Sequence, residues 1–303
     1  MKEKSILFIC TGNVFRSMSA EYAFKKYLQD NKISSWKVGS AGTIANPQNI
    51  DGKTIQTINK LGMKVNHKLR KVTKKLLSEY DVIVAMAEDH LEFIQSKLNH
   101  RDVLLFNELA IGKKTSIWDF GDEVKDYKTN RLAVEKFIEK TVKYIFKNIP
   151  QLYKTVCERY YLFEEFAEGH RKTHINGYAF SKLSETKNTL AFMSIDVSEK
   201  SGGHILVIPK KRYVDFTDIP TNILNELMTS IQKIGEKMRL NDKDYNILLN
   251  NGVNAGQFIF HAHFHIIIRK PNDGVVIEGW NHHKKISKKK FTELNKKLLK
   301  EIK

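Results

Sequence analysis

The stretch SILFICTGNVFRS, residues 5–17, indicates the fold of the first half of the chain. Residues 5–9 are a short apolar run typical of a buried strand, and a helix is predicted from about Met18 to Gln29. Between them, Cys10 and Arg16 are separated by five residues. A loop of this length, lying between a strand and a helix, can curl around one phosphate with its N–H groups turned inward.

Each residue type in this loop suits phosphate chemistry. The planar fork of Arg16 matches two phosphate oxygens, and the inward donors with the helix dipole favour the nucleophilic thiolate of Cys10. Ser17 can donate a hydrogen bond to the sulfur, and Gly12 and Asn13 suit unusual backbone angles. A buried cysteine beside an unrelated arginine is the alternative, which the position between strand and helix disfavours. The predicted phosphate-binding residues are Thr11, Gly12, Asn13, Val14, Phe15 and Ser17.

Working outward from the loop, apolar runs alternate with helical patterns as far as about residue 148. This alternation predicts an α/β domain with a parallel sheet. The expected strands are 38–43 and 81–86, and the expected helices are 51–62, one beginning near Asp89, and 126–148.

The pattern changes near Asn148-Ile149-Pro150, where we place a domain boundary. The predicted domains are therefore 1–150 and 151–303. In the second half most apolar runs read as strands around a single helix at about 220–240, which predicts an α+β domain. The expected strands are 189–195, 204–209, 245–250 and 258–269.

A second motif, HAHFHIII at residues 261–268, alternates histidine with apolar residues. If the segment is one strand, His261, His263 and His265 all face the same way. Three aligned imidazoles have two main explanations. They bind a metal, as catalytic zinc sites with three histidines do, or one is a nucleophile that its neighbours orient.

The first half resembles the low-molecular-weight protein tyrosine phosphatase family over roughly residues 4–148. The resemblance implies a parallel four-stranded sheet flanked by helices and a cysteinyl-phosphate intermediate at Cys10. It also implies that Asp119 protonates the leaving group. The segments that carry the resemblance are Cys10–Ser17, Ser40–Thr43, Asn66–Arg70, Ala85-Met86 and Ile117–Phe120.

Three residues depart from this family pattern. Phe15 stands where many members have a second cysteine, and Met18 replaces a usual proline. Phe120 also replaces a proline, which predicts a less rigid loop around Asp119. Arsenate reductases share the fold and loop, but their chemistry needs further cysteines, and the only other cysteine is Cys157.

The second half resembles the histidine triad (HIT) family over about residues 175–271, through Gly203–Lys210, Asn250–Gln257 and the triad itself. The resemblance implies an antiparallel HIT-like sheet and attack by His263 on an α-phosphate, giving a nucleotidyl-histidine. The other implied site residues are His261, His265 and His204, with Asn250 and Gln257 as phosphate contacts.

In the nucleoside pocket this half departs from the family. The strand Leu190–Met193 leads to Ser194 where an acidic residue usually follows, and Asp196 comes two residues later. The identity of the nucleotide therefore stays open. The family resemblance implies no catalytic metal and no cofactor.

Composition bounds the partners. The chain has 303 residues, with 51 Lys+Arg against 34 Asp+Glu and a formal net charge of +17. This charge favours anionic partners, although a solvated lysine-rich surface is the alternative. Two cysteines favour a reducing compartment, and no stretch approaches the roughly 20 apolar residues of a membrane span. We expect a cytoplasmic protein with no membrane partner.

The expected substrates are a phosphorylated protein or small aryl phosphate and a purine nucleotide, and the HIT resemblance adds a homodimer. Two alternatives stay open. One domain is a non-catalytic sensor of a phosphorylated ligand, or the HIT domain processes nucleic-acid ends. The second alternative draws on the lysine run of Lys284-Lys285 and Lys288–Lys290.

Overall fold

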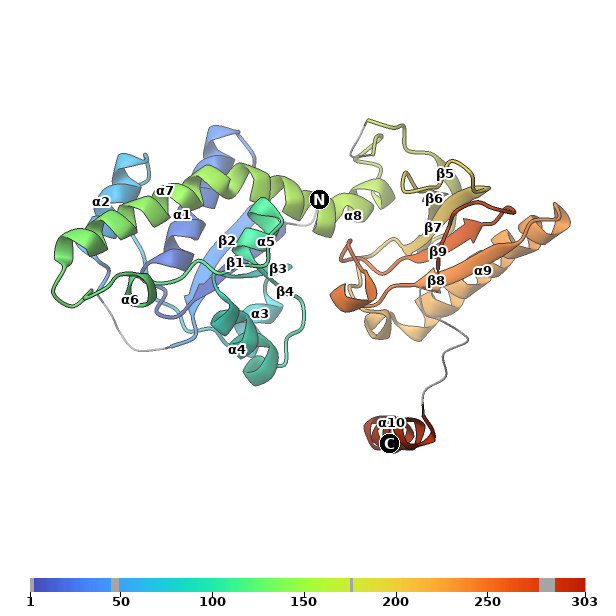
Figure 1. The fold of residues 1–303 in the computed structure, drawn as a ribbon. Coiled ribbons are helices and arrows are strands. Elements are labelled where there is room, and N and C mark those ends of the chain that lie inside the picture. The colour runs from blue at the N-terminus through green and yellow to red at the C-terminus, as the bar shows by residue number, and fades with distance from the viewer. Residues whose placement is uncertain (1–2, 45–48, 175–176, 278–286, 303) are drawn as a thin grey trace.

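The computed structural model describes residues 3–44, 49–174, 177–277 and 287–302. Its two sheets lie in separate lobes, which a long helical run joins (Figure 1). The first sheet has four parallel strands in the order β2-β1-β3-β4, which confirms the predicted fold of the first half. Its strands are β1 (Lys4–Cys10), β2 (Trp36–Gly42), β3 (Val82–Ala85) and β4 (Val103–Leu105).

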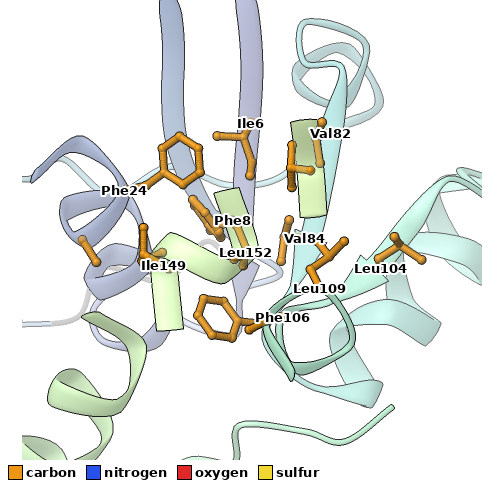
Figure 2. Packing of buried hydrophobic residues seen from close by; sticks show 14 of the residues in the cluster. Ile6, Phe8, Phe24, Val82, Val84, Leu104, Phe106, Leu109, Ile149 and Leu152 are labelled. Atoms are coloured by element: carbon orange, nitrogen blue, oxygen red, sulfur yellow. The ribbon is translucent and has the colours of Figure 1, made fainter. Parts of the chain in front are cut away.

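Both faces of this sheet are covered by helices. Alternate residues of β1 face two separate apolar cores, because successive side chains of a strand point to opposite faces. Ile6 and Phe8 pack with α1, α5 and α7 (Figure 2), whereas Leu7 and Ile9 pack with α3 and α4. The helices of this half are α1 (Arg16–Asp30), α2 (Gly52–Lys60), α3 (Lys74–Ser78), α4 (Glu88–Leu98), α5 (Phe106–Ile111), α6 (Phe120–Glu123) and α7 (Arg131–Val156).

Helix α7 crosses the predicted domain boundary, so the expected helix end at residue 148 is wrong. Pro150 lies inside it. A proline inside a helix costs about 3 kcal/mol. Ile149 and Leu152 are 1% and 0% exposed, and burying each contributes about 1.5–3 kcal/mol, enough to offset that cost. The division of the chain at residue 150 stays a prediction, but that position now lies within a continuous helix.

The helical run continues beyond α7 into the second lobe. It passes through a π-helical turn, η1 (Cys157–Tyr161), into α8 (Leu162–Ala167). Tyr160 and Tyr161 are buried in the core of the first lobe, whereas Phe163 and Phe166 are buried among strand residues of the second. One run of helix is therefore part of both cores.

The second sheet has five antiparallel strands in the order β5-β6-β7-β9-β8, which confirms the predicted α+β domain. Helix α9 (Thr221–Leu240) packs on one face of this sheet and α8 on the other. The strands of this sheet are β5 (Lys182–Glu185), β6 (Thr189–Met193), β7 (Gly203–Pro209), β8 (Tyr245–Leu249) and β9 (Phe264–Ile268). Two short 3-10 turns, η2 (Phe216–Asp218) and η3 (Val253–Ala255), lie in the loops of this lobe.

The predicted strand 258–269 is wrong in its first half. Only 264–268 is a strand, and the segment before it is irregular. The backbone N–H of Phe260 donates to the carbonyl of Arg159, and that of Ala262 donates to the carbonyl of Tyr213. Because these donors bind a helix and a loop, the segment does not extend the ladder.

The chain ends in α10 (Lys288–Ile302), in which no described residue is buried. Lys288–Lys290 open this helix, whereas Lys284 and Lys285 lie outside the described residues. Among the helices that the structure describes, none is long and apolar enough to cross a membrane.

Burial of α7 can be tested by truncating one leucine at each end of the helix. Leu152→Ala should lower the free energy of unfolding of the first lobe by about 2–5 kcal/mol, because Leu152 is 0% exposed. Leu132→Ala, at a residue 64% exposed on the same helix, should cost less than about 0.5 kcal/mol. Urea unfolding followed by tryptophan fluorescence measures both. Equal effects would contradict the packing of α7.

Candidate active sites

The loop after β1 has the form that its sequence predicts. Cys10 ends β1, α1 begins at Arg16, and the Cys10 thiol is buried with its Sγ 2.9 Å from Oγ of Ser17. Gly42 pairs with Cys10 from β2, and a Cβ at Gly42 would lie 2.6 Å from the carbonyl oxygen of Thr11. Only glycine therefore leaves room for the loop at the end of the sheet.

Asn13 holds the shape of this loop. It is 1% exposed and adopts a left-handed backbone with φ of 58°, which asparagine tolerates better than most residues. Its side-chain N–H donates to Ser17 Oγ at 3.1 Å and to Ser40 Oγ at 2.7 Å, and its Oδ1 accepts from the Arg70 N–H. The prediction that Gly12 also needs a special backbone is wrong, since within the described loop only Asn13 has a positive φ.

Arg16 and Asp119 meet at the mouth of the loop. The guanidinium is 3% exposed, and its Nη2 lies 2.9 Å from Asp119 Oδ2 and 3.1 Å from Thr11 Oγ1. Its Nη1 donates to the carbonyl of Ile117 at 3.0 Å. Two residues that the sequence placed about a hundred positions apart thus lie in direct contact beside Cys10.

Phe120 supports the Asp119 side chain in two ways. Its N–H donates to Asp119 Oδ1 at 2.8 Å, a bond that a proline at this position cannot make. Its ring lies 6.3 Å from that of Phe15 and 6.1 Å from that of Tyr127.

Phe15 is itself buried, with Val14 packed against its cluster, so these two loop residues can reach a phosphate only through their backbone. The expected looseness of the Asp119 loop stays a prediction.

Two histidines at this site were missed from the sequence. His90 Nε2 lies 2.9 Å from Thr11 Oγ1, and burial, with the nearby charge of Arg16, lowers the pKa of His90 to about 3. His67 Nε2 lies 2.9 Å from the Asn13 carbonyl, and burial lowers its pKa too. His90 follows β3, and the carboxyl ends of parallel strands meet at one edge of a sheet. That rule could have placed His90 beside the Cys10 loop.

The second site is a cavity of about 220 Å³ beside β7 and β9. Its polar side includes His204, His263, His265 and Asn250. Its apolar side comprises Leu162 and Phe163 of α8 together with Phe192, Ile195, Leu206, Phe258 and Ile259.

Hydrogen bonds determine which ring nitrogen is free on each histidine of this cavity. His204 Nδ1 donates to the carbonyl of Asp196, so its Nε2 accepts from His265 Nδ1 at 2.9 Å. His263 Nδ1 donates to the carbonyl of His261 at 2.6 Å, which leaves a lone pair on His263 Nε2. Burial lowers the pKa of His263, and it lowers that of His265 to about 3, so both rings stay neutral near pH 7.

The prediction that all three triad histidines face one way is wrong for His261. That ring is fully buried, and its Nε2 donates to the carbonyl of Pro209 at 2.7 Å. It does not line the cavity, since the chain is irregular before β9. With His261 Nε2 and His263 Nδ1 both bonded to carbonyls, the three rings offer no shared metal position. In the part of the chain that the structure describes, no three His, Cys, Asp or Glu side chains are arranged to hold a metal ion.

Gln257 does not reach this cavity, contrary to the prediction. Its side chain is 3% exposed and accepts from the Gly252 N–H while donating to the carbonyl of Val214. It therefore holds the preceding loop. Asn250 does line the cavity, and so does Asp196, which is exposed.

Comparison with known proteins gives a match for each lobe. The family model "Low molecular weight phosphotyrosine protein phosphatase" matches residues 5–159, and the HIT domain model matches residues 180–272. The chicken low molecular weight phosphotyrosine protein phosphatase is 39% identical over 101 residues, covering 32% of this chain and 63% of that protein.

For the second lobe, an uncharacterized HIT-like protein of Methanocaldococcus jannaschii is 40% identical over 106 residues, covering 34% of this chain and 81% of that protein. The adenosine 5'-monophosphoramidase HNT1 of Saccharomyces cerevisiae is 37% identical over 99 residues, covering 33% and 60%. The matched segments thus span about three fifths of the chicken and yeast proteins.

The low pKa values of the buried histidines predict how stability depends on pH. The unfolded chain binds a proton on each histidine near pH 6.5, whereas folded His90 and His261 have pKa values of about 3. Their contribution to stability is complete above pH 6.5 and is lost as the pH falls. Between pH 7 and 5.5 the loss should be about 1 kcal/mol for each histidine.

Urea unfolding at pH 7, 6 and 5.5 measures this loss. Over the same interval the free energy of unfolding of His90→Gln should fall by about 1 kcal/mol less than that of the unchanged chain, because the variant lacks one of these histidines. A stability that stays constant or rises on acidification would contradict the neutral, buried state of these rings.

Proposed function

The chain belongs to the low molecular weight phosphotyrosine protein phosphatase family through residues 5–159 and to the HIT family through residues 180–272, and on this basis we propose that it is a bifunctional hydrolase. Both families are families of hydrolases. The proposed sites are the Cys10 loop and the cavity around His263. The contact of Arg16 and Asp119 beside the Cys10 thiol carries the first proposal, and the free lone pair of His263 carries the second.

At the first site, the Cys10 sulfur attacks the phosphorus of a phosphate monoester. The S–P bond forms as the P–O bond breaks, and Asp119 gives its proton to the departing oxygen. Water then attacks the phosphorus of the cysteinyl-phosphate while Asp119 takes up a proton from that water. The S–P bond breaks, which returns the Cys10 thiolate, and inorganic phosphate leaves. In the free site Arg16 is paired with Asp119. A bound phosphate takes over the guanidinium and leaves the carboxyl beside the leaving oxygen.

The substrate class that fits this site is a phosphorylated tyrosine side chain or a small aryl phosphate. Trp118 precedes Asp119 and is 40% exposed, and Tyr127, which packs against Phe120, is 39% exposed. Two exposed rings close to the general acid offer an apolar surface for an aryl leaving group.

At the second site, His263 Nε2 attacks the α-phosphate of a nucleotide, and a P–N bond forms as the leaving group departs. The carbonyl of His261 accepts a hydrogen bond from His263 Nδ1 and stabilises the cationic ring that results. Buried His265 Nε2 has no hydrogen-bond partner among the described residues, and its lone pair can accept a hydrogen bond from the water that hydrolyses the intermediate. Hydrolysis of the nucleotidyl-histidine releases a nucleoside monophosphate.

The apolar side of the cavity suits a flat purine base. Phe163 and Phe192, whose ring centroids are 5.4 Å apart, line it. Asp196 is exposed at the cavity and takes the place of the acidic residue expected at Ser194, as a contact for the ribose hydroxyls. A homodimer and a nucleic-acid partner rest on the sequence alone and stay predictions.

The first site is tested with an aryl phosphate. Cys10→Ser should abolish turnover of p-nitrophenyl phosphate and leave vanadate binding measurable, because Arg16 and the loop N–H groups remain. Asp119→Asn should lower turnover by roughly 10²–10⁴-fold for phenyl phosphate, whose leaving group needs a proton, and less for p-nitrophenyl phosphate. Near-normal turnover by Cys10→Ser would rule out Cys10 as the nucleophile.

The second site is tested with adenosine and guanosine phosphoramidates and with dinucleoside polyphosphates. Hydrolysis should release nucleoside monophosphate without added metal and survive a strong chelator, because the nucleophile is a side chain. His263→Ala should abolish it and His263→Asn should trap substrate. The two substitutions also serve as mutual controls, since His263→Ala should spare the aryl phosphatase and Cys10→Ser should spare nucleotide cleavage. Activity lost to chelation and restored by zinc would overturn the nucleotidyl-histidine.

A further inference from the structure

Arg159 binds residues 258–260, the triad segment, which leads into the histidine triad. It lies in the π-helical turn η1, and the residue is 5% exposed. Its Nε donates to the carbonyl of Phe258 at 3.0 Å, and its own carbonyl accepts the Phe260 N–H at 2.7 Å. The guanidinium also lies 4.8 Å from the ring centroids of both phenylalanines. Arg159 therefore holds two alternate residues of this segment, through backbone and side chain together.

These contacts lead directly to the nucleophile. Phe260 is 2% exposed, and its ring lies 4.7 Å from that of Tyr160, inside the core of the first lobe. The next residue is His261, whose carbonyl accepts the Nδ1–H of His263. Two residues separate the anchored backbone of Phe260 from the ring whose Nε2 must attack. A shift of Phe260 therefore moves both the ring and the carbonyl that selects its tautomer.

The π-helical geometry of η1 is consistent with a carbonyl that bonds outside the helix. A π turn pairs residues five apart instead of four, so a carbonyl can lack its usual partner within the helix. In η1 the carbonyl of Arg159 accepts from Phe260, which lies about a hundred residues later in the chain. The irregular turn thus attaches the helix to the triad segment.

The first lobe orients Arg159. Its Nη1 lies 3.6 Å from Glu108 Oε1 on α5, and both side chains are largely buried. Another contact of η1 in this lobe is made by Tyr161, whose hydroxyl accepts the Ser5 N–H at 3.1 Å. The triad segment is therefore held by groups that belong to the phosphatase half of the chain.

We propose that Arg159 is a positioning residue for nucleotidyl transfer, through which the phosphatase domain orients Nε2 of His263. The inference rests on the proposed function of the His263 site and adds a dependence on the other domain. Two residues of the segment that Arg159 holds, Phe258 and Ile259, line the cavity, but its other apolar residues and Asp196 lie outside that segment. Loss of Arg159 should therefore affect the chemical step more than nucleotide binding.

The test uses Arg159→Lys in the full chain. Lysine keeps the charge but loses the Nε–H bond to Phe258 and the planar group over the two rings. The kcat for adenosine phosphoramidate should fall at least tenfold and up to roughly a hundredfold, as expected when a nucleophile is displaced by about 1 Å. The KM should change by a smaller factor than the kcat. Hydrolysis of p-nitrophenyl phosphate at Cys10 should stay unchanged, which shows that the first lobe is folded.

Two further variants separate positioning from stability. Glu108→Gln should lower the same kcat by a smaller factor, because Arg159 loses its ion pair and keeps its bonds to the triad segment. Tyr161→Phe is the matched control: it removes a buried hydrogen bond two residues away, between η1 and β1, without contacting residues 258–260. It should lower the urea midpoint and leave the kcat unchanged. A kcat for Arg159→Lys equal to that of the unchanged chain, or an equal loss in Tyr161→Phe, would overturn the inference.

A second readout separates this inference from the proposed function. If the unchanged chain shows no His263-dependent turnover, the proposed function fails. In that case the effect of Arg159 on His263 is measured by the ¹⁵N chemical shifts of the His263 ring, which report its tautomer. Arg159→Lys should change these shifts, and Tyr161→Phe should not. Identical His263 shifts in all three proteins would overturn the role of Arg159.

Discussion

One run of helix that is buried in two hydrophobic cores is the constraint on which the rest of the structure depends. Leu152 and Val156 at the end of α7 fill the core of the parallel sheet, and Phe163 and Phe166 of α8 fill the core of the antiparallel sheet. A helix advances 1.5 Å and turns about 100° per residue, so the two sets of side chains have a set spacing and rotation. The two lobes cannot turn freely about such a connection.

Side-chain pairs reinforce this arrangement. Arg212, in the loop after β7, lies 2.8 Å from Asp81, the residue before β3, and both side chains are 10% exposed. Lys4 of β1 lies 2.7 Å from Glu165 of α8. Buried ion pairs contribute little net stability because desolvation opposes them, but a misaligned pair is costly. These contacts therefore favour one relative orientation of the lobes.

The two candidate sites solve the same physical problem by similar means. Each site needs a nucleophile that is held in one orientation or tautomer inside a poorly solvated pocket. In each site a neighbouring group holds the nucleophile in this way through hydrogen bonds. Asn13 orients Ser17 toward Cys10, and the carbonyl of His261 selects the tautomer of His263. Burial keeps the histidine rings neutral, because a charged imidazole loses its hydration.

Local patterns in the sequence determined both fold classes and the strand–loop–helix around Cys10, and they favoured Cys10 as a nucleophile, whereas the choice of His263 came from the resemblance to the HIT family. These features depend on residues within one or two helical turns of each other, or on an alternation with a period of two residues. A short stretch of sequence is enough to show either pattern. The end of α7, the direction of His261, the role of Gln257 and the presence of His90 were decided only by the tertiary structure. In each case the partner is distant in the chain: the sheet core that buries Ile149 and Leu152 for α7, the Pro209 carbonyl for His261, the Val214 carbonyl for Gln257 and Thr11 for His90. A buried polar group must find a partner wherever the fold provides one, so the folded chain, rather than the residue's own neighbourhood, determines where it points.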